Sequence, residues 1–157
     1  MLVGVKTTTT SMTFFTGRYD SKLDSKGRLV LPSKFKAQLP EEGGHELIIQ
    51  QGIEPYLSVY PLLEFKKVVS KISGLSDFSE ENRQIRLNFF SGIATVELDV
   101  NGRFLIPKNL QVYAELQKEV VLIGMQNMIA VWDPNLFDKH LLKDPREYSK
   151  LMQKLDK

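Results

Sequence analysis

Residues 14–35 read FFTGRYDSKLDSKGRLVLPSKF, and residues 89–110 read FFSGIATVELDVNGRFLIPKNL. At a constant offset of 75, eight of these 22 positions are identical: two Phe, two Gly, and one each of Leu, Asp, Arg and Pro. The similarity continues downstream at an offset of 72, which pairs Gly52 with Gly124. The offset changes within residues 40–44, where EEGG predicts a loop. Identities kept in one register indicate a tandem duplication, so the chain is one small module written twice.

Each copy is expected to hold two short strands around a glycine turn, followed by two more apolar strands. The candidates are residues 18–23, 29–31, 47–50 and 57–60 in the first copy and residues 93–98, 104–106, 120–123 and 129–132 in the second. Asn101-Gly102 favours a type I′ hairpin turn, in which both central residues have positive φ, and Lys26-Gly27 is the weaker counterpart. A short helix is expected to begin at Pro32 and at Pro107. These patterns predict a β-rich α+β fold.

Longer helices are expected to close each copy. Apolar residues at helical spacing predict a helix over residues 61–72. Asp133-Pro134 is a good start for a helix that runs to about Leu142, and EYSKLMQKL predicts a final amphipathic helix. Ser79 is the expected N-cap of a helix that links the two copies.

These patterns divide the chain into five parts. They are a disordered extension over residues 1–11, a first repeat over 12–75, a linking helix over 76–88, a second repeat over 89–142 and a C-terminal helix over 143–157. The extension contains four consecutive Thr and no periodic pattern, and Met12 is an alternative start.

The composition is that of an ordinary globular chain. Of 157 residues, 42% are apolar and 25% are charged, and the formal net charge is only +2. The absence of cysteine excludes disulfides, thiolate metal sites and thiol catalysis. No apolar run is long enough to cross a bilayer, and the N-terminal MLVGV is too short for a signal peptide. We therefore expect a soluble, cytoplasmic protein.

The duplicated motif that could carry chemistry is Asp-x-x-Gly-Arg, at Asp24–Arg28 and at Asp99–Arg103. A purely structural interpretation is open, in which Gly27 and Gly102 permit the turns and each aspartate caps loop amides or pairs with its arginine. A turn does not, however, require an arginine directly after its glycine. A repeated exposed arginine on a rigid turn supplies the planar, charged group that a phosphate or guanine contact requires.

Local charge favours the first motif as a nucleic-acid contact. The segment from Gly17 to Lys36 has six basic and two acidic residues, a net charge of +4, whereas the segment from Gly92 to Asn109 has a net charge of zero. Phosphate contacts depend on the local density of Lys and Arg, so Arg18, Lys22 and Lys26 join the candidate DNA-binding residues. A solvated charged face would have the same composition.

No enzymatic interpretation fits these motifs. An aspartic-protease dyad would need a compact Asp-x-Gly loop, whereas here an arginine follows Asp-x-x-Gly and keeps the carboxylate ionised. His45 and His140 lack partners at metal-ligand spacing, and no nucleotide-binding loop or serine nucleophile motif is present. The recurring aromatic residues indicate core packing more than base stacking; they are Phe14, Phe15, Tyr60, Phe89, Phe90 and Trp132. We predict a non-enzyme with no catalytic residue, metal site or cofactor.

The two quoted segments, with LDVNGRFLIP in the second copy and VVLIGMQNMIAVWD after it, closely resemble the bacterial MraZ proteins. These are duplicated members of the swapped-hairpin group of transcription regulators that includes AbrB. The resemblance covers about Met12 to Leu142. It implies two tandem swapped-hairpin modules, of the double-split β-barrel type, with flanking helices.

The resemblance also implies a function. MraZ-like proteins form ring-shaped homo-oligomers that bind direct repeats in double-stranded promoter DNA, and they usually repress the gene cluster for cell division and cell-wall synthesis. On this basis Arg28 and Arg103 are the expected principal DNA contacts, Asp24 and Asp99 brace the loops, and the protein is associated with the nucleoid. No membrane or small-molecule partner is implied. The alternative is a protein–protein interaction or scaffold module that uses the same fold without reading DNA.

Overall fold

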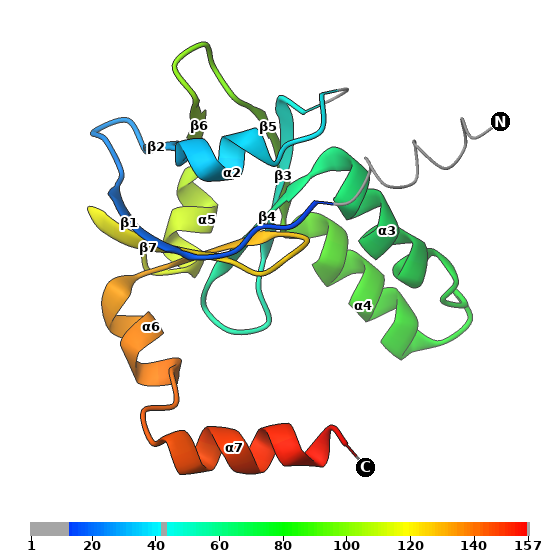
Figure 1. Cartoon of the computed structure of the whole chain (residues 1–157). Helices are drawn as coiled ribbons and strands as arrows, with labels where there is room; N and C mark the ends of the chain where they lie inside the picture. Colours follow the sequence, from blue (N-terminus) through cyan, green and yellow to red (C-terminus); the bar gives the residue numbers. More distant parts are fainter. Residues whose placement is uncertain (1–12, 42–43, 157) are drawn as a thin grey trace, which may run out of the picture.

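The computed structural model describes residues 13–41 and 44–156 and has an α+β fold rich in antiparallel strands (Figure 1). The first copy contributes β1 (Arg18–Lys22), β2 (Arg28–Val30), α2 (Ser33–Ala37), β3 (Glu46–Gln51), β4 (Leu57–Pro61) and α3 (Leu62–Ser73). After α4 (Glu80–Ser91), the second copy contributes β5 (Ile93–Glu97), β6 (Arg103–Leu105), α5 (Lys108–Tyr113), β7 (Glu119–Gly124), β8 (Ile129–Trp132), α6 (Pro134–His140) and α7 (Pro145–Lys154). The predicted fold class is confirmed. The prediction for residues 1–11 falls outside the described residues.

The two copies exchange strands with each other. A six-stranded antiparallel sheet has the order β1-β7-β8-β4-β3-β5, so β1 lies beside a strand of the second copy and β5 beside a strand of the first. The remaining strands, β2 and β6, pair with each other; we call this two-stranded element the ribbon. Within residues 13–41 and 44–156 the larger sheet is open rather than closed into a barrel. Each copy therefore completes the backbone hydrogen bonding of the other.

A pseudo-two-fold axis relates the two copies. Leu29 lies opposite Phe104 in the ribbon, and Ser58 lies opposite Ala130 where β4 pairs with β8. The members of the first pair are repeat equivalents at the offset of 75, and those of the second pair at the offset of 72. Because each residue faces its own equivalent, the axis passes through both pairings. The duplication in the sequence is thus a symmetry of the structure.

The predicted hairpins are wrong in their strand pairing. Beyond the turn that joins them, β1 and β2 share only an isolated bridge between Leu23 and Leu29, after which they enter different sheets. The reason is that β2 and β6 pair across the pseudo-two-fold axis, which buries Leu29 and Phe104 together. Alternating polarity identifies a strand, but it does not identify the strand's partner.

The repeat register also differs from the sequence alignment by one residue. The first residue of β1 lies opposite Ile123, whereas the first residue of β5 lies opposite Gln50. These partners are 73 positions apart, so the predicted match of Gly52 with Gly124 is wrong. The offset returns to 72 in β4 and β8 because the turn before β4 has five residues and the turn before β8 has four. A shift of one residue decides which face of the sheet each side chain meets.

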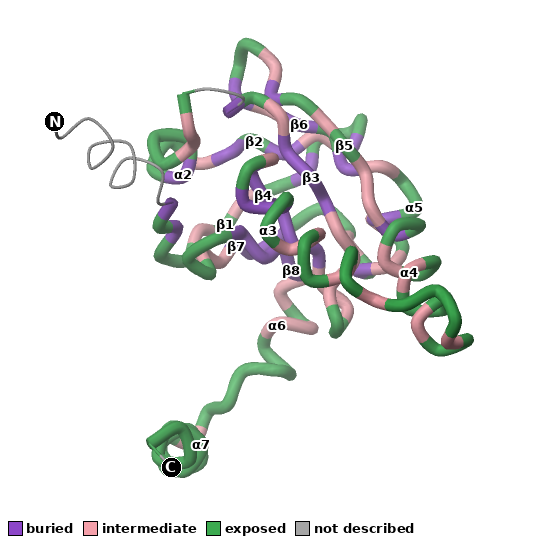
Figure 2. Tube along the Cα trace, turned by 90° about the vertical axis from the view of Figure 1, so that its right-hand side faces the viewer, coloured by how far each residue is buried: buried purple, intermediate pink, exposed green. Residues whose placement is uncertain are grey.

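Apolar residues cover both faces of the six-stranded sheet. On β3, Leu47 and Ile49 face the core beneath the ribbon, whereas Ile48 faces the opposite core, on the side of α3 and α6. Figure 2 shows the buried residues concentrated in the strands. The prediction of aromatic core packing is correct for most of these rings, but Phe14 and Phe90 are 59% and 45% exposed. Repeat equivalence therefore did not guarantee burial.

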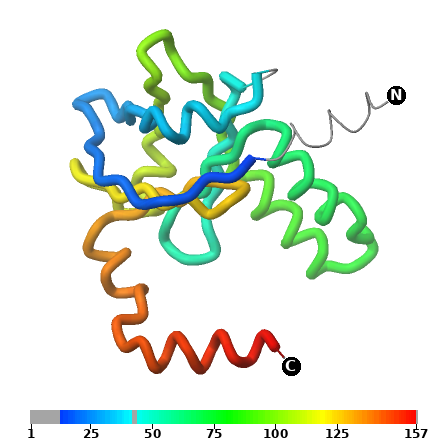
Figure 3. Tube along the Cα trace, viewed as in Figure 1, coloured from blue at the N-terminus to red at the C-terminus, as the bar shows by residue number. Residues whose placement is uncertain are grey.

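Polar caps set the ends of several helices. Ser79 accepts a hydrogen bond from the amide of Asn82 and begins α4, as predicted. Asp133 caps α6, which ends at His140. α7 begins at Pro145, a residue that is favoured in the first turn of a helix. α7 projects away from the rest of the chain and is exposed along its length (Figure 3). None of the helices in the described part of the chain is long and apolar enough to span a membrane.

The ribbon gives a direct test of this topology. Leu29 is fully buried and Val30, its neighbour on the same strand, is 50% exposed. We expect Leu29→Ala to lower the free energy of unfolding by about 2–5 kcal/mol because it leaves a cavity beneath the ribbon. Val30→Ala should lower it by less than about 1 kcal/mol, within the range of strand propensity. Urea denaturation measures both changes, and equal losses would contradict the assigned faces of β2.

Candidate nucleic-acid interface

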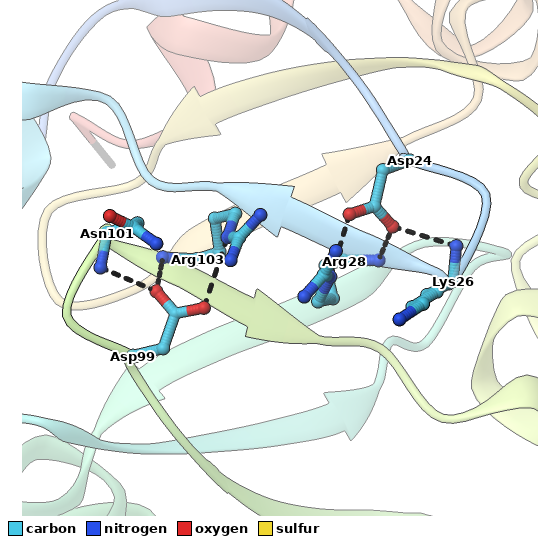
Figure 4. A network of polar contacts seen from close by, with 6 residues as sticks. All are labelled: Asp24, Lys26, Arg28, Asp99, Asn101 and Arg103. Carbon is cyan, nitrogen blue, oxygen red and sulfur yellow. Dashed lines mark hydrogen bonds and ion pairs between the residues drawn. The ribbon is translucent and has the colours of Figure 1, made fainter.

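Loop 1, residues 24–28, is organised by the carboxylate of Asp24 (Figure 4). One oxygen, Oδ1, accepts hydrogen bonds from the amides of Lys26 at 2.9 Å and Arg28 at 2.8 Å. The other, Oδ2, accepts from Nε of Arg28 at 2.7 Å. The two structural roles considered for the aspartate, capping the loop and pairing with the arginine, therefore occur together. Asp24 thereby fixes both the backbone of the loop and the position of the guanidinium group.

Loop 2, residues 99–103, repeats this geometry. Asp99 Oδ1 accepts from the amides of Asn101 at 2.8 Å and Arg103 at 2.9 Å, and Oδ2 accepts from Nε of Arg103 at 3.1 Å. In both loops the arginine side chain donates to the aspartate through Nε alone. Its terminal Nη groups make no hydrogen bond to any residue that the structure describes. Each guanidinium group is held in place with its outer donors available to a ligand.

The turns in the two loops are of one type, which differs from the type I′ prediction. Gly27 and Gly102 have φ of 82° and 75°, whereas Asn101 is not among the described residues with positive φ. The amide of each glycine donates to the carbonyl of its loop's aspartate. This is a type I turn followed by a left-handed glycine, a common three-residue connection. The aspartate carboxylate stabilises this turn by accepting hydrogen bonds from the amides two and four residues further along the chain.

Both arginines lie on the outer face of the ribbon. Leu29 and Phe104 point inward, so alternation places Arg28 and Val30 on the outer face of β2, and Arg103 and Leu105 on that of β6. Arg28 lies opposite Leu105, and Val30 lies opposite Arg103. The outer face thus presents two braced arginines on a diagonal, with a half-exposed aliphatic side chain opposite each.

Residues of each copy hold the loop of the other copy. The amide of Leu31 donates to the carbonyl of Gly102, and the amide of Ile106 donates to the carbonyl of Gly27, both at 2.9 Å. Lys36 of α2 reaches Gly102, and its repeat equivalent Gln111 packs against Gly27. Neither Lys36 nor Gln111 is among the site residues predicted from the sequence. Their offset of 75 was the available signal, but only the exchanged strands show which loop each one meets.

The remaining predicted site residues separate into two groups. Lys26 is exposed in loop 1, beside Arg28. Arg18 and Lys22 lie on the face of the six-stranded sheet that is turned away from the ribbon. Arg18 Cζ lies 5.0 Å from the centroid of the Phe137 ring in α6, and Lys22, four residues further along β1, points to the same face. The structure therefore places Lys26 with Arg28 in loop 1 and keeps Arg18 and Lys22 apart from both arginines.

The loop hydrogen bonds keep both aspartates charged. The amide of Arg28 is the largest influence that lowers the pKa of Asp24, and the guanidinium of Arg28 and the amide of Lys26 add to it. The amide of Arg103 has the same leading effect on the pKa of Asp99. Two fixed guanidinium groups on an exposed strand pair suit bidentate hydrogen bonding to a phosphate or to the edge of a guanine.

A comparison with protein families finds two copies of one domain in this chain. The family model described as "MraZ protein, putative antitoxin-like" matches residues 14–88 and again residues 89–155. The two matches meet between Asn88 and Phe89, near the end of α4. Together they cover nearly all of the described chain.

Curated relatives match over similar lengths. A protein of Cytophaga hutchinsonii named "Transcriptional regulator MraZ" is 46% identical over 143 residues, which are 91% of this chain and 95% of the relative. Proteins of the same name from Halothermothrix orenii and Finegoldia magna are 38% and 37% identical. Those alignments cover 87% and 90% of this chain and 93% and 96% of the relatives.

The aspartate pKa values predict how the loops respond to acid. Both folded-state pKa values are lowered, so the stabilisation by Asp24 and Asp99 is complete above the unfolded-state pKa and is lost as pH falls through the folded-state values. Carboxyl-carbon NMR titration should give midpoints for both residues below that of the aspartate in an unfolded peptide SKLDSKGRL. Midpoints at or above the peptide value would show that the carboxylates do not hold the loops.

Alanine substitution of the loop glycines should separate backbone strain from packing. Gly27→Ala and Gly102→Ala both force an L-residue to positive φ, which costs about 1–2 kcal/mol of stability. At Gly27 the new methyl group also meets the Gln111 amide, which donates to the carbonyl of Ile106, so we expect a further loss of about 0.5–1.5 kcal/mol. Gly74→Ala, with a φ of −80° and open space around it, is the matched control. Thermal denaturation should rank Gly27→Ala as the most destabilising of the three.

Proposed function

The chain belongs to the MraZ family of transcriptional regulators, and we propose that it binds double-stranded DNA through the outer face of the ribbon. The observation that carries this proposal is the repeated geometry of loops 1 and 2, in which an aspartate uses Nε to hold each arginine. A loop that served only as a turn would need no such guanidinium group. Transcriptional regulation is a non-enzymatic function, in agreement with the sequence-based prediction.

We propose that the ribbon enters the major groove of DNA. The major groove of B-DNA is about 12 Å wide and admits a two-stranded β-ribbon. We propose that Arg28 and Arg103 donate through their Nη groups to guanine edges or phosphates, while Asp24 and Asp99 keep the guanidinium groups in position. Leu105 and Val30, each opposite an arginine, are placed to contact apolar base surfaces such as thymine methyl groups. Lys26 adds a phosphate contact beside Arg28.

We further propose how this binding acts in the cell. A single ribbon contributes few contacts, so one chain would bind weakly. In a ring-shaped homo-oligomer several ribbons could engage consecutive direct repeats, and linkage would raise avidity by about 10²–10⁴ over one site. Direct repeats suit rotationally related subunits, whereas palindromes suit isolated two-fold dimers. The resemblance to MraZ proteins supports repression of a cell-division and cell-wall gene cluster by a cytoplasmic, nucleoid-associated protein.

The arginines are the first test of this proposal. We expect Arg28→Ala to abolish the electrophoretic shift of DNA taken from directly upstream of the gene for this chain. Light scattering should show an assembly of unchanged size, because the arginine side chains are surface groups. Asp24→Asn retains the Oδ1 acceptor but loses the carboxylate that holds Nε, so it should weaken binding without unfolding loop 1. Binding should also fall steeply with salt because phosphate contacts release counterions.

Charge-matched controls complete the experiment. Lys66→Ala removes one exposed positive charge from α3, and Lys22→Ala tests the predicted contact on the other face of the sheet. Full operator binding by the Arg28→Ala/Arg103→Ala double variant would disprove the assignment to the ribbon. A flat salt response would support a protein partner instead.

A further inference from the structure

We propose that a cleft beside loop 1 binds backbone phosphates of the DNA that the ribbon reads, and that the described residues around loop 2 form no equivalent cluster of lysines. This inference rests on the proposed function. The cleft has a volume of about 700 Å³ and lies between loop 1, the end of β6, the start of α5 and the chain just before β7. Three lysines, Lys26, Lys108 and Lys118, line it. Of these three, only Lys26 is among the site residues predicted from the sequence.

Hydrogen bonds to backbone carbonyls fix the walls of this cleft. The amide of Leu23 donates to the carbonyl of Lys118 at 2.7 Å, which ties the chain before β7 to the base of loop 1. The Gln111 side chain donates to the carbonyl of Ile106 at 2.7 Å and packs against Gly27. Lysines from three separate segments are therefore held around one cavity, although no stretch of sequence contains all three.

The charged residues that line the cleft are three lysines and one aspartate, so their net charge is positive. Asp24 also lines it, but its carboxylate is engaged by Arg28 and by two loop amides. Among the described residues, no ion pair engages Lys26, Lys108 or Lys118, and all three are exposed. Three ammonium groups around one cleft match a phosphodiester, an anion whose charge is shared between two oxygens.

The pseudo-two-fold axis supplies an internal comparison. The repeat equivalents of Lys26, Lys108 and Lys118 are Asn101, Ser33 and His45. The last equivalence is structural, because the amide of Leu98 donates to the carbonyl of His45 just as that of Leu23 donates to Lys118. All three lysines of the first site are thus absent from the second.

At one lining position the lysine belongs to loop 2 instead. Lys36 lies beside loop 2, whereas its repeat equivalent Gln111 lies beside loop 1. The two ends of the ribbon therefore have the same hydrogen-bonding geometry but different charge, with three lysines at loop 1 and one at loop 2. We infer that each chain binds the DNA backbone more tightly at loop 1 than at loop 2. This difference gives the bound chain a defined orientation along the duplex.

Salt dependence measures this directly. Each neutralised phosphate contributes about 0.9 to the slope of log binding constant against log salt concentration. We expect Lys108→Gln/Lys118→Gln to lower the magnitude of the slope by about 2, measured by fluorescence anisotropy with a labelled duplex of the upstream DNA. The control Lys66→Gln/Lys71→Gln removes the same charge from exposed positions on α3 and should leave the slope unchanged.

A gain-of-contact variant tests the asymmetry. Ser33→Lys/His45→Lys gives loop 2 two of the missing lysines and should raise the magnitude of the slope, whereas lysines placed at two exposed α3 positions, Ser70 and Ser73, should not. Equal slopes for the cleft variant and its α3 control, with Arg28→Ala still abolishing binding, would overturn this inference and leave the proposed function intact. Failure of the unmodified chain to bind the duplex would overturn both.

Discussion

The exchange of strands between the two copies is the constraint on which the rest of the structure depends. Neither copy satisfies its own backbone hydrogen bonds: β1 needs β7, β5 needs β3, and β2 and β6 need each other. Unpaired backbone groups are unfavourable, so both copies contribute strands to one sheet and side chains to the cores on both of its faces. The inward side chains of the ribbon, Leu29 and Phe104, cover the core beneath the ribbon. Duplication here made a single folding unit from two incomplete halves.

The same exchange builds the candidate interface. Because the ribbon crosses the pseudo-two-fold axis, the two Asp-x-x-Gly-Arg loops lie at its opposite ends, and each loop glycine is held by the other copy. The arginines are thereby placed on a rigid surface rather than on independent hairpins. A local motif, repeated by duplication, becomes a pair of guanidinium groups at a fixed separation, which is a prerequisite for recognition of a regular polymer such as DNA.

The sequence predicted both loops but not what surrounds them. The roles of Asp24 and Asp99 could be anticipated because an aspartate two residues before free loop amides caps them through local geometry. The pairing of β1 with β7 could not be anticipated. Alternation of polar and apolar residues shows which side chains face a core, but it does not show which strand lies beside them. For the same reason, local charge does not show which loop a lysine reaches: Lys36 belongs to the basic first segment but reaches loop 2, whereas Lys108 and Lys118 of the second copy line the cleft beside loop 1.

The sequence by itself determined the duplication, the α+β class, the two loops and their aspartate–arginine pairs, since these depend on identities kept in register and on contacts within five residues. Only the tertiary structure decided the strand partners, the offset of 73 in β3 and β7, the face occupied by Arg18 and the clustering of three lysines beside loop 1. Those features depend on contacts between residues far apart in the chain. Their geometry is set by closure of the shared core around the pseudo-two-fold axis.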